Sequence, residues 1–182
     1  MLGALNHKVE TPLTYEAAQR FLPFSRASVH TAFEQLQLTG LARRMPARCV
    51  QLEFVQHARA LWERALPLLQ NPSRRTVELD RMPNGLRVCL AGESALAERT
   101  MLAAPREAVS ACALHDYLRL PHQPAALPSA AGDTAHLQLW LHSPSLIGGD
   151  GVDPLSLYLT LRQNADERVQ QALEQLLDEF PW

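Results

Sequence analysis

The segment from Arg26 to Leu38 is closed at both ends by residues that stop a helix, and this limits its fold more than any other feature of the chain. Pro23 ends whatever helix precedes it, because the residue before a proline is pushed out of the helical region. Ser25 stands where an N-cap is needed, and Gly40 stands where a left-handed C-cap ends a helix. Between these caps, apolar side chains recur at intervals of three and four residues, at Val29, Ala32, Phe33 and Leu36. The sequence therefore predicts one helix over residues 26–38 with a single buried stripe.

The flanking segments predict a shorter helix before this one and a hairpin after it. Thr14 can cap a helix that ends at Pro23, and the residues before Thr14 leave room for only a strand or a stub. A first helix is either formed by residues 1–8 or absent. After Gly40, residues 41–44 and 50–54 are typical of two short strands, and the second alternates apolar with polar side chains. The predicted order is helix, turn, helix and hairpin.

This order, together with the residues that carry it, resembles a known DNA-binding module. The stretch TYEAAQRFLPFSRASVHTAFEQLQLTGLARR is similar to the winged helix-turn-helix of bacterial transcriptional regulators. In that family a Ser-Arg-x-Ser/Thr-Val sequence opens the recognition helix, and Leu-x-x-x-Gly-Leu precedes the wing; both are present here, although the wing is short. The resemblance covers about a third of the chain, and it implies that the helix at 26–38 reads double-stranded DNA.

The outward face of the predicted recognition helix suits contact with base edges. Small and hydrogen-bonding side chains there let a helix enter the major groove, and a guanidinium in the first turn can reach bases and phosphates. Glu34, on the same face, is unfavourable near phosphates. Arginines on the hairpin suit contacts with the DNA backbone. The predicted DNA-binding residues are therefore Ser25, Arg26, Ser28, His30 and Thr31 on the helix, and Arg43, Arg44 and Arg48 on the hairpin.

The formal net charge of −2 hides an uneven distribution along the chain. Up to Arg75 there are ten Lys and Arg side chains against five Glu, a charge of +5, and the remainder holds seven basic against fourteen acidic side chains, a charge of −7. A basic module joined to an acidic one is compatible with DNA binding by the first alone. Residues 71–75 carry a loop signal at the same place. We expect two domains, 1–71 for DNA binding and 72–182 for regulation or dimerisation.

Residues 55–69 predict a linker helix that is apolar on one side, with Pro67 ending it early near Ala65. Such a stripe either pairs with its twin in a homodimer or packs on its own domain, and the sequence favours neither. The acidic part predicts a small α/β domain that ends in two helices, so the fold class is α+β. Its expected elements are strands at Thr76–Leu79 and Leu86–Leu90 around the turn 83–85, a helix at Glu93–Met101, strands at Ala108–Ala113 and Leu137–Leu141, a loop at Pro121–Asp133, a helix from Pro154 capped by Asp153, and a last helix opened by Asn164 and Glu167.

No catalytic, metal or cofactor site is predicted, and no enzyme. The three cysteines are far apart, and no two of the seven histidines have the i, i+4 spacing of a helical zinc site. The pair His115 and Asp116 is more typical of a surface contact than of an acid–base dyad, and an enzyme would need these residues or His136 to converge with another polar group. Gly148–Gly151 lacks the Lys-Ser/Thr of a phosphate loop. No apolar run reaches the length of a membrane span, so we expect a cytoplasmic protein with no membrane partner.

Two stretches of the acidic part, AGESALAERTMLAAPR and VDPLSLYLTLRQNADERVQQALEQLL, resemble abortive-infection (AbiEi-like) antitoxin regulators. In those proteins a winged helix precedes an α/β domain. The resemblance implies an autorepressor, homodimeric on DNA, with a toxin or another protein as a possible partner. The alternative is a protein–protein adaptor or antitoxin module, whose winged helix is structural and whose acidic helices cover a basic partner. The operator and the effector are not predicted.

Overall fold

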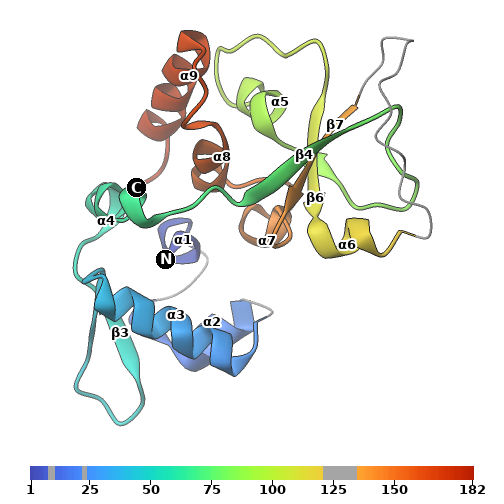
Figure 1. Cartoon of the computed structure of the whole chain (residues 1–182). Coiled ribbons are helices and arrows are strands. Elements are labelled where there is room, and N and C mark those ends of the chain that lie inside the picture. Colours follow the sequence, from blue (N-terminus) through green and yellow to red (C-terminus); the bar gives the residue numbers. More distant parts are fainter. Residues whose placement is uncertain (8–10, 22–23, 121–134) are drawn as a thin grey trace. The chain divides into compact units, whose positions relative to one another are not determined.

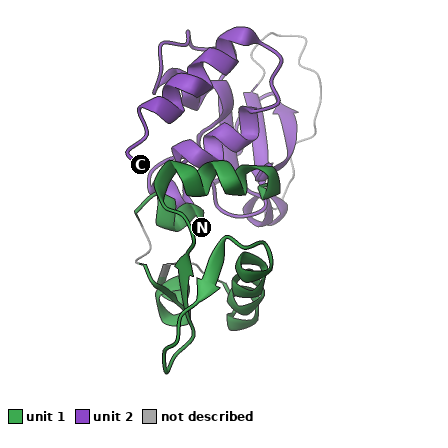
Figure 2. Ribbon diagram, turned by 90° about the vertical axis from the view of Figure 1, so that its left-hand side faces the viewer, with its two compact units in different colours: residues 1–69, 182 green, residues 70–181 purple. Residues whose placement is uncertain are grey.

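The computed structural model describes residues 1–7, 11–21, 24–120 and 135–182, and the chain divides into two compact units. The N-terminal unit comprises residues 1–69 with Trp182, and the C-terminal unit comprises residues 70–181 (Figure 2). Each unit combines helices with one small sheet, so the chain is a mixed α+β protein. Among the described residues, no helix combines the length and the apolar character that crossing a membrane requires.

The N-terminal unit places two consecutive helices beside a three-stranded antiparallel sheet (Figure 1). Its elements are α1 (Leu2–Leu5), β1 (Leu13–Thr14), α2 (Tyr15–Phe21), α3 (Arg26–Leu38), β2 (Ala42–Arg44), β3 (Gln51–Phe54) and α4 (Ala58–Ala65). The strand order is β1-β3-β2. Helix α2 begins as predicted, since the hydroxyl oxygen of Thr14 accepts from the backbone N–H of Ala17 at 3.0 Å. The predicted helix over 26–38 is confirmed at both ends.

Gly40 ends α3 and also makes room for an arginine from α4. Its φ of +67° lies in the left-handed region, as predicted for the C-cap. A Cβ built on Gly40 would lie 3.1 Å from a terminal guanidinium nitrogen of Arg64. The backbone conformation therefore requires the glycine, and a side chain there would in addition displace the flexible end of Arg64 by a few tenths of an ångström.

Replacing Gly40 by Ala is expected to lower the free energy of unfolding of the N-terminal unit by about 1–2 kcal/mol, because an L-residue is strained at this φ. Chemical denaturation measures the loss. The Arg64→Ala background separates the two causes: if Arg64 adds to the cost, the same Gly40→Ala change will be less damaging there. An unchanged midpoint in Gly40→Ala would contradict the assignment.

Helix α4 is shorter than the sequence predicts. It starts at Ala58, whose φ is +52°, and it ends at Ala65, where a single 3-10 turn over Leu66–Leu68 contains Pro67. The early end near Ala65 is as predicted. Val55, expected on the apolar stripe, lies before the helix and is exposed. The middle of the stripe is covered within one chain: Leu61, Trp62 and Ala65 are 2%, 1% and 0% exposed, and the ring of Trp182 lies 6.4 Å from that of Trp62. Ala58, Leu66 and Leu69 are half-buried.

The C-terminal unit is built on a four-stranded mixed sheet. Its strands are β4 (Ser73–Leu79), β5 (Cys89–Leu90), β6 (Val109–Ala113) and β7 (Ala135–Trp140), in the order β4-β7-β6-β5. Strands β6 and β7 are parallel, and the two outer pairs are antiparallel. The helices of this unit are α5 (Gly92–Ala97), α6 (Leu114–Leu118), α7 (Ser145–Gly148), α8 (Pro154–Leu161) and α9 (Glu167–Asp178).

The predicted strand pair around the turn 83–85 is wrong. Strand β4 pairs with β7 and β5 pairs with β6, so the two segments lie at opposite edges of the sheet. The second strand is also shorter, Cys89–Leu90 instead of Leu86–Leu90. The physical reason is that β7, whose Leu137 and Leu139 are fully buried, has to lie at the centre of the sheet and takes the place beside β4.

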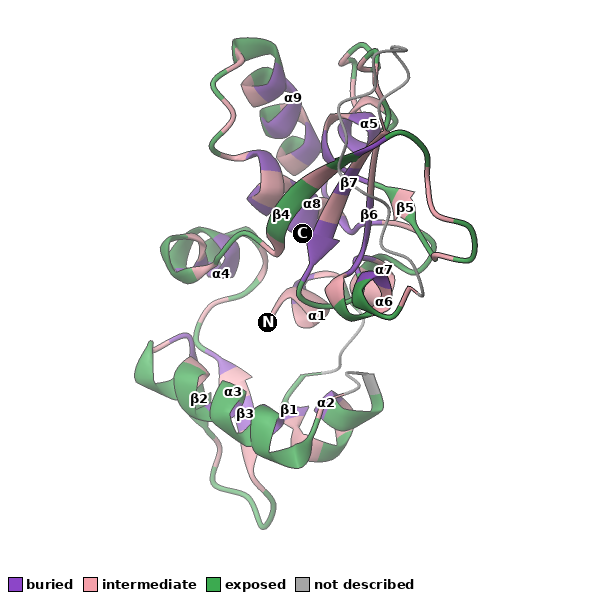
Figure 3. Ribbon diagram, turned by 45° about the vertical axis from the view of Figure 1, so that its right-hand side comes forward, coloured by how far each residue is buried: buried purple, intermediate pink, exposed green. Residues whose placement is uncertain are grey.

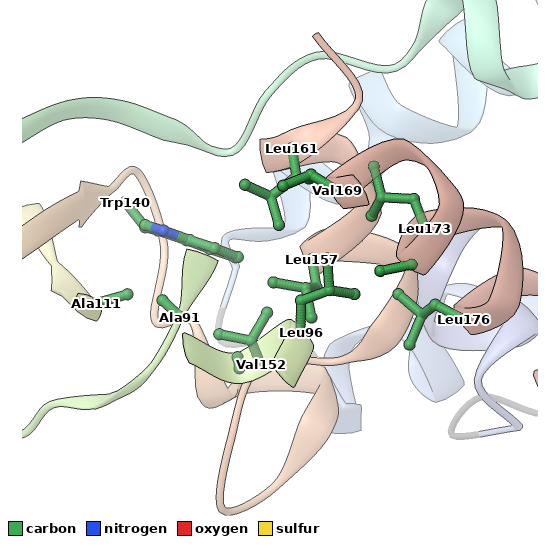
Figure 4. Close-up of a cluster of buried hydrophobic side chains, with 12 residues drawn as sticks. Ala91, Leu96, Ala111, Trp140, Val152, Leu157, Leu161, Val169, Leu173 and Leu176 are labelled. Atoms are coloured by element: carbon green, nitrogen blue, oxygen red, sulfur yellow. The ribbon is translucent and has the colours of Figure 1, made fainter. Parts of the chain in front are cut away.

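Two apolar clusters fix this unit, and Figure 3 shows the buried residues gathered along its inner strands and helix faces. The smaller cluster joins Leu79, Leu137 and Leu139 to Cys112 and Tyr117. The larger one brings Trp140, Leu157 and Leu173 together between the sheet and α5, α8 and α9 (Figure 4). Each face of the sheet therefore packs on its own layer, which makes this unit a small α/β arrangement that ends in two helices.

Several local details depart from the sequence prediction. Helix α5 ends at Ala97 and not at Met101. The last helix is capped by Asp166, which accepts from the backbone N–H of Arg168, while the Asn164 side chain instead donates to Glu93 at 3.0 Å. The loop expected at 71–75 gives way to β4 from Ser73 onward. Gly148 is the last residue of the short helix α7. The expected loop Pro121–Asp133 lies outside the described residues. The cap of Asp153 on α8 is as predicted, with Ser156 donating at 3.0 Å.

Candidate nucleic-acid interface

The first turn of α3 is organised by a pair of serines. The hydroxyl oxygen of Ser25 accepts from the backbone N–H of Ser28 at 3.1 Å, and the two hydroxyl oxygens lie 2.9 Å apart. Both side chains are exposed. The two serines cap the N-terminus of the helix, and this fixes the position of the neighbouring Arg26.

The inner face of α3 is held by an aromatic stack that the sequence prediction did not include. Val29 and Phe33 are 3% and 2% exposed, whereas Ala32 is exposed and Leu36 is half-buried. The ring of Tyr15, from the first residue of α2, stacks on Phe33 with ring centres 4.5 Å apart. It is also parallel to His30 at 6.1 Å. The only sequence signal was an aromatic residue directly after the cap of α2.

The outer face of α3 presents polar side chains to solvent, and Figure 3 shows most of its visible surface as exposed. Arg26, His30 and Thr31 are exposed on it, as the sequence analysis expects of this face. The Thr31 hydroxyl donates to the carbonyl of Ala27 at 3.1 Å. His30 lies 3.5 Å from the carboxylate of Glu34. The face therefore offers one guanidinium together with hydroxyl and imidazole groups that already have partners on the same helix.

The hairpin of β2 and β3 carries the three other predicted arginines, and one of them is already engaged. Arg43 faces Glu53 across the strands and donates to its carboxylate at 2.8 and 3.1 Å. This contact was predictable once the two strands were paired, because opposite residues share a face. Arg44 and Arg48 are exposed and form no ion pair with any described residue. Of the three, these two are the cations available to a phosphate.

The boundary between the units changes the charge assigned to each. Arg74 and Arg75 belong to β4, in the C-terminal unit. The N-terminal unit therefore holds eight basic against five acidic side chains, a charge of +3, and the C-terminal unit holds nine against fourteen, a charge of −5. The basic excess remains with α3 and the hairpin, but it is smaller than the +5 counted from the sequence.

The other candidate groups do not converge. His115 and Asp116 lie 3.0 Å apart at the surface, and His136 pairs with Glu107 at 2.5 Å on a different part of the unit. In the part of the chain that the structure describes, no three His, Cys, Asp or Glu side chains come together as metal ligands. A cleft of about 540 Å³ lies between residues 101–105 and α9, with Glu93, Asp166 and Arg168 among its polar lining residues.

Comparisons with known proteins supply no further guide to this surface. No family model, no curated protein and no solved structure matches the chain. The candidate interface therefore stands on its own geometry: a capped helix with a polar outer face, next to a hairpin with two available arginines.

Proposed function

We propose that this chain is a DNA-binding transcriptional regulator whose N-terminal unit is a winged helix-turn-helix. The observation that carries the proposal is that α3 exposes a polar face with Arg26 in its first turn, in the same unit as a hairpin that exposes Arg44 and Arg48. The order α1-β1-α2-α3-β2-β3 and the antiparallel sheet β1-β3-β2 support it, because this arrangement leaves one face of the second helix open for a groove.

The hydrogen bonds within α3 narrow the chemistry of the proposed readout. Arg26 is the side chain suited to donate to guanine O6 and N7. Because Thr31 donates its own hydroxyl hydrogen to Ala27, its oxygen is left as an acceptor for an adenine or cytosine amino group, and its methyl can contact thymine. Ser25 and Ser28 then position a phosphate at the start of α3. His30 has to share its imidazole with Glu34.

The variants Arg26→Ala and Arg44→Ala are expected to weaken DNA binding in different ways. Arg26→Ala should reduce the preference for a selected sequence over a random duplex by about 5- to 150-fold, since a base contact contributes about 1–3 kcal/mol of discrimination. Arg44→Ala should weaken binding to both duplexes alike and lower the slope of log K against log salt by about 1. Fluorescence anisotropy measures both, on a duplex enriched by in vitro selection and on a scrambled duplex.

Arg59→Ala is the matched control, because Arg59 is exposed on α4, pairs with Glu63 at 3.2 Å and carries the same charge. It should leave the preference and the slope unchanged. If Arg26→Ala and Arg44→Ala bind both duplexes as the unaltered chain does, the proposed interface is wrong.

The second candidate is a protein–protein adaptor or antitoxin module, and the cleft beside α9 favours it. Its lining combines the apolar Leu102 and Val169 with Glu93 and with the ion pair of Asp166 and Arg168, which suits a partner segment that brings an apolar side chain and polar groups of its own. If the chain is an adaptor, we expect that it does not bind DNA at low salt and that it forms a stoichiometric complex with one protein. Retention of the selected duplex at low salt, with the Arg26 and Arg44 effects above, would exclude a purely structural role for the N-terminal unit.

A further inference from the structure

Strand β4 is an open edge of the C-terminal sheet. It is the first strand in the order β4-β7-β6-β5, and β7 is its only strand neighbour among the described residues. At seven residues it is also the longest strand of the chain's described part. Arg74, Arg75, Thr76 and Glu78 are exposed, and Figure 3 shows much of β4 as exposed. An edge of this length presents main-chain N–H and C=O groups that can pair with another strand.

The charges on β4 are arranged so that the strand complements itself. Its first half carries Arg74 and Arg75, and its second half carries Glu78, followed by Asp80. Natural edges are often protected by charges of one sign, which repel a second copy. Here an antiparallel twin would instead meet basic residues with acidic ones, and opposite charges directly across two strands are stabilising.

The register follows from the same charges. The pairing of β4 with β7 is regular from Arg75 to Leu79, and its register shifts between Ser73 and Arg75. Along the regular part, two-fold pairing about an axis through the sheet keeps each side chain on its own face, so residues of equal parity lie opposite one another. Centring the pair on Thr76 sets Thr76 opposite its twin and brings Arg74, at the register shift, next to Glu78 of the second copy, twice. Centring it on Arg75 or on Glu78 sets like charges face to face, which is destabilising, and centring it on Val77 would need Asp80, which lies beyond the end of β4 at Leu79.

A second surface that could form a dimer, the apolar side of α4, is already buried within one chain. On this side of α4, Leu61, Trp62 and Ala65 are buried within a single chain and do not need a second copy to cover them. We propose that two copies of this chain dimerise by antiparallel pairing of their β4 strands, centred on Thr76, so that the two four-stranded sheets become one. This surface is independent of α3 and the hairpin, and its test uses no DNA.

The first test is site-specific cross-linking of the full chain, in a Cys49→Ser background because Cys49 is exposed. Thr76→Cys should form an intermolecular disulfide under mild oxidation, since directly opposite Cβ atoms lie about 5 Å apart. Asp80→Cys is the matched control: it is exposed next to the same strand, but in this register its twin lies about eight residues away, more than about 20 Å along the strand. Cross-linking of both variants to the same extent, or of neither, overturns the proposal.

The second test exchanges charges and measures the dimer by sedimentation equilibrium between about 1 µM and about 500 µM chain. Glu78→Arg and Arg74→Glu should each raise the dimer dissociation constant by about tenfold, because each sets two like-charged pairs in the interface. The double exchange should restore it to within about threefold. Circular dichroism establishes that each variant is folded. A chain that stays monomeric throughout, or single variants that dimerise as the unaltered chain does, overturns the proposal.

Discussion

Replacing Phe33 by Ala is expected to unfold most of the N-terminal unit at 25 °C. Phe33 is 2% exposed and stacks on Tyr15 at 4.5 Å, so its removal leaves a cavity under α3. Such truncations cost about 3–5 kcal/mol, and a core of this size rarely provides more than about 3–5 kcal/mol. Hydrogen exchange followed by mass spectrometry should therefore show fast exchange throughout α3 and the strands β2 and β3, and binding to DNA should be lost.

Leu38→Ala is the control for this result, because Leu38 lies on the same helix but is 79% exposed. Surface changes of this kind shift stability by no more than about 0.5 kcal/mol. Exchange in α3 should then match that of the unaltered chain. If α3 is equally protected from hydrogen exchange in the Phe33→Ala and Leu38→Ala variants, burial of Phe33 is not what stabilises this unit.

Replacing Leu157 by Ala is the second change with a large expected effect, now in the C-terminal unit. Leu157 is fully buried on α8, in the cluster that contains Trp140, Leu96 and Leu173 (Figure 4). Leu-to-Ala changes in such cores cost about 3–5 kcal/mol, of which part is the cavity left behind. The loss should appear in urea denaturation followed by Trp fluorescence, since Trp140 lies in the same cluster, and as faster exchange in α8.

The matched control is Leu118→Ala on α6, where the leucine is 53% exposed. Its free energy of unfolding, obtained from the same urea denaturation, should change by no more than about 0.5 kcal/mol. A loss of similar size in the two variants would show that the cluster around Leu157 is no more important to stability than the surface of the same unit.

The N-terminal unit was predictable because its signals are local. Thr14, Ser25 and Gly40 each mark a helix end through a hydrogen bond or a backbone angle within a few residues, and all three act as predicted. The pairing of β4 was not predictable in this way, because its partner β7 begins at Ala135 and the signal at 83–85 is only a turn. A turn shows that the chain reverses, not which strand will lie beside it.

The same distinction holds within the candidate interface. Exposure of Arg26, Arg44 and Arg48 follows from their places on a helix face and a hairpin, which the sequence pattern contains. The engagement of Arg43 by Glu53 depends on strand register, and the stack of Tyr15 on Phe33 depends on how α2 meets α3. The approach of Arg64 to Gly40 joins two helices that no periodicity links. Sequence therefore indicates which side chains are candidates, and packing decides which of them remain available.

The order β4-β7-β6-β5 also has a consequence for synthesis on the ribosome. Helices α2 and α3 and the hairpin of β2 and β3 are joined by contacts close along the chain, so this unit can fold early. Strand β4 has to wait for β7, and residues 80–134 must be made before the first residue of β7. At about 5–20 residues per second, that delay is about 3–10 s. During this interval both edges of β4 are unpaired, so a nascent chain exposes a strand whose basic first half and acidic second half can pair with another copy.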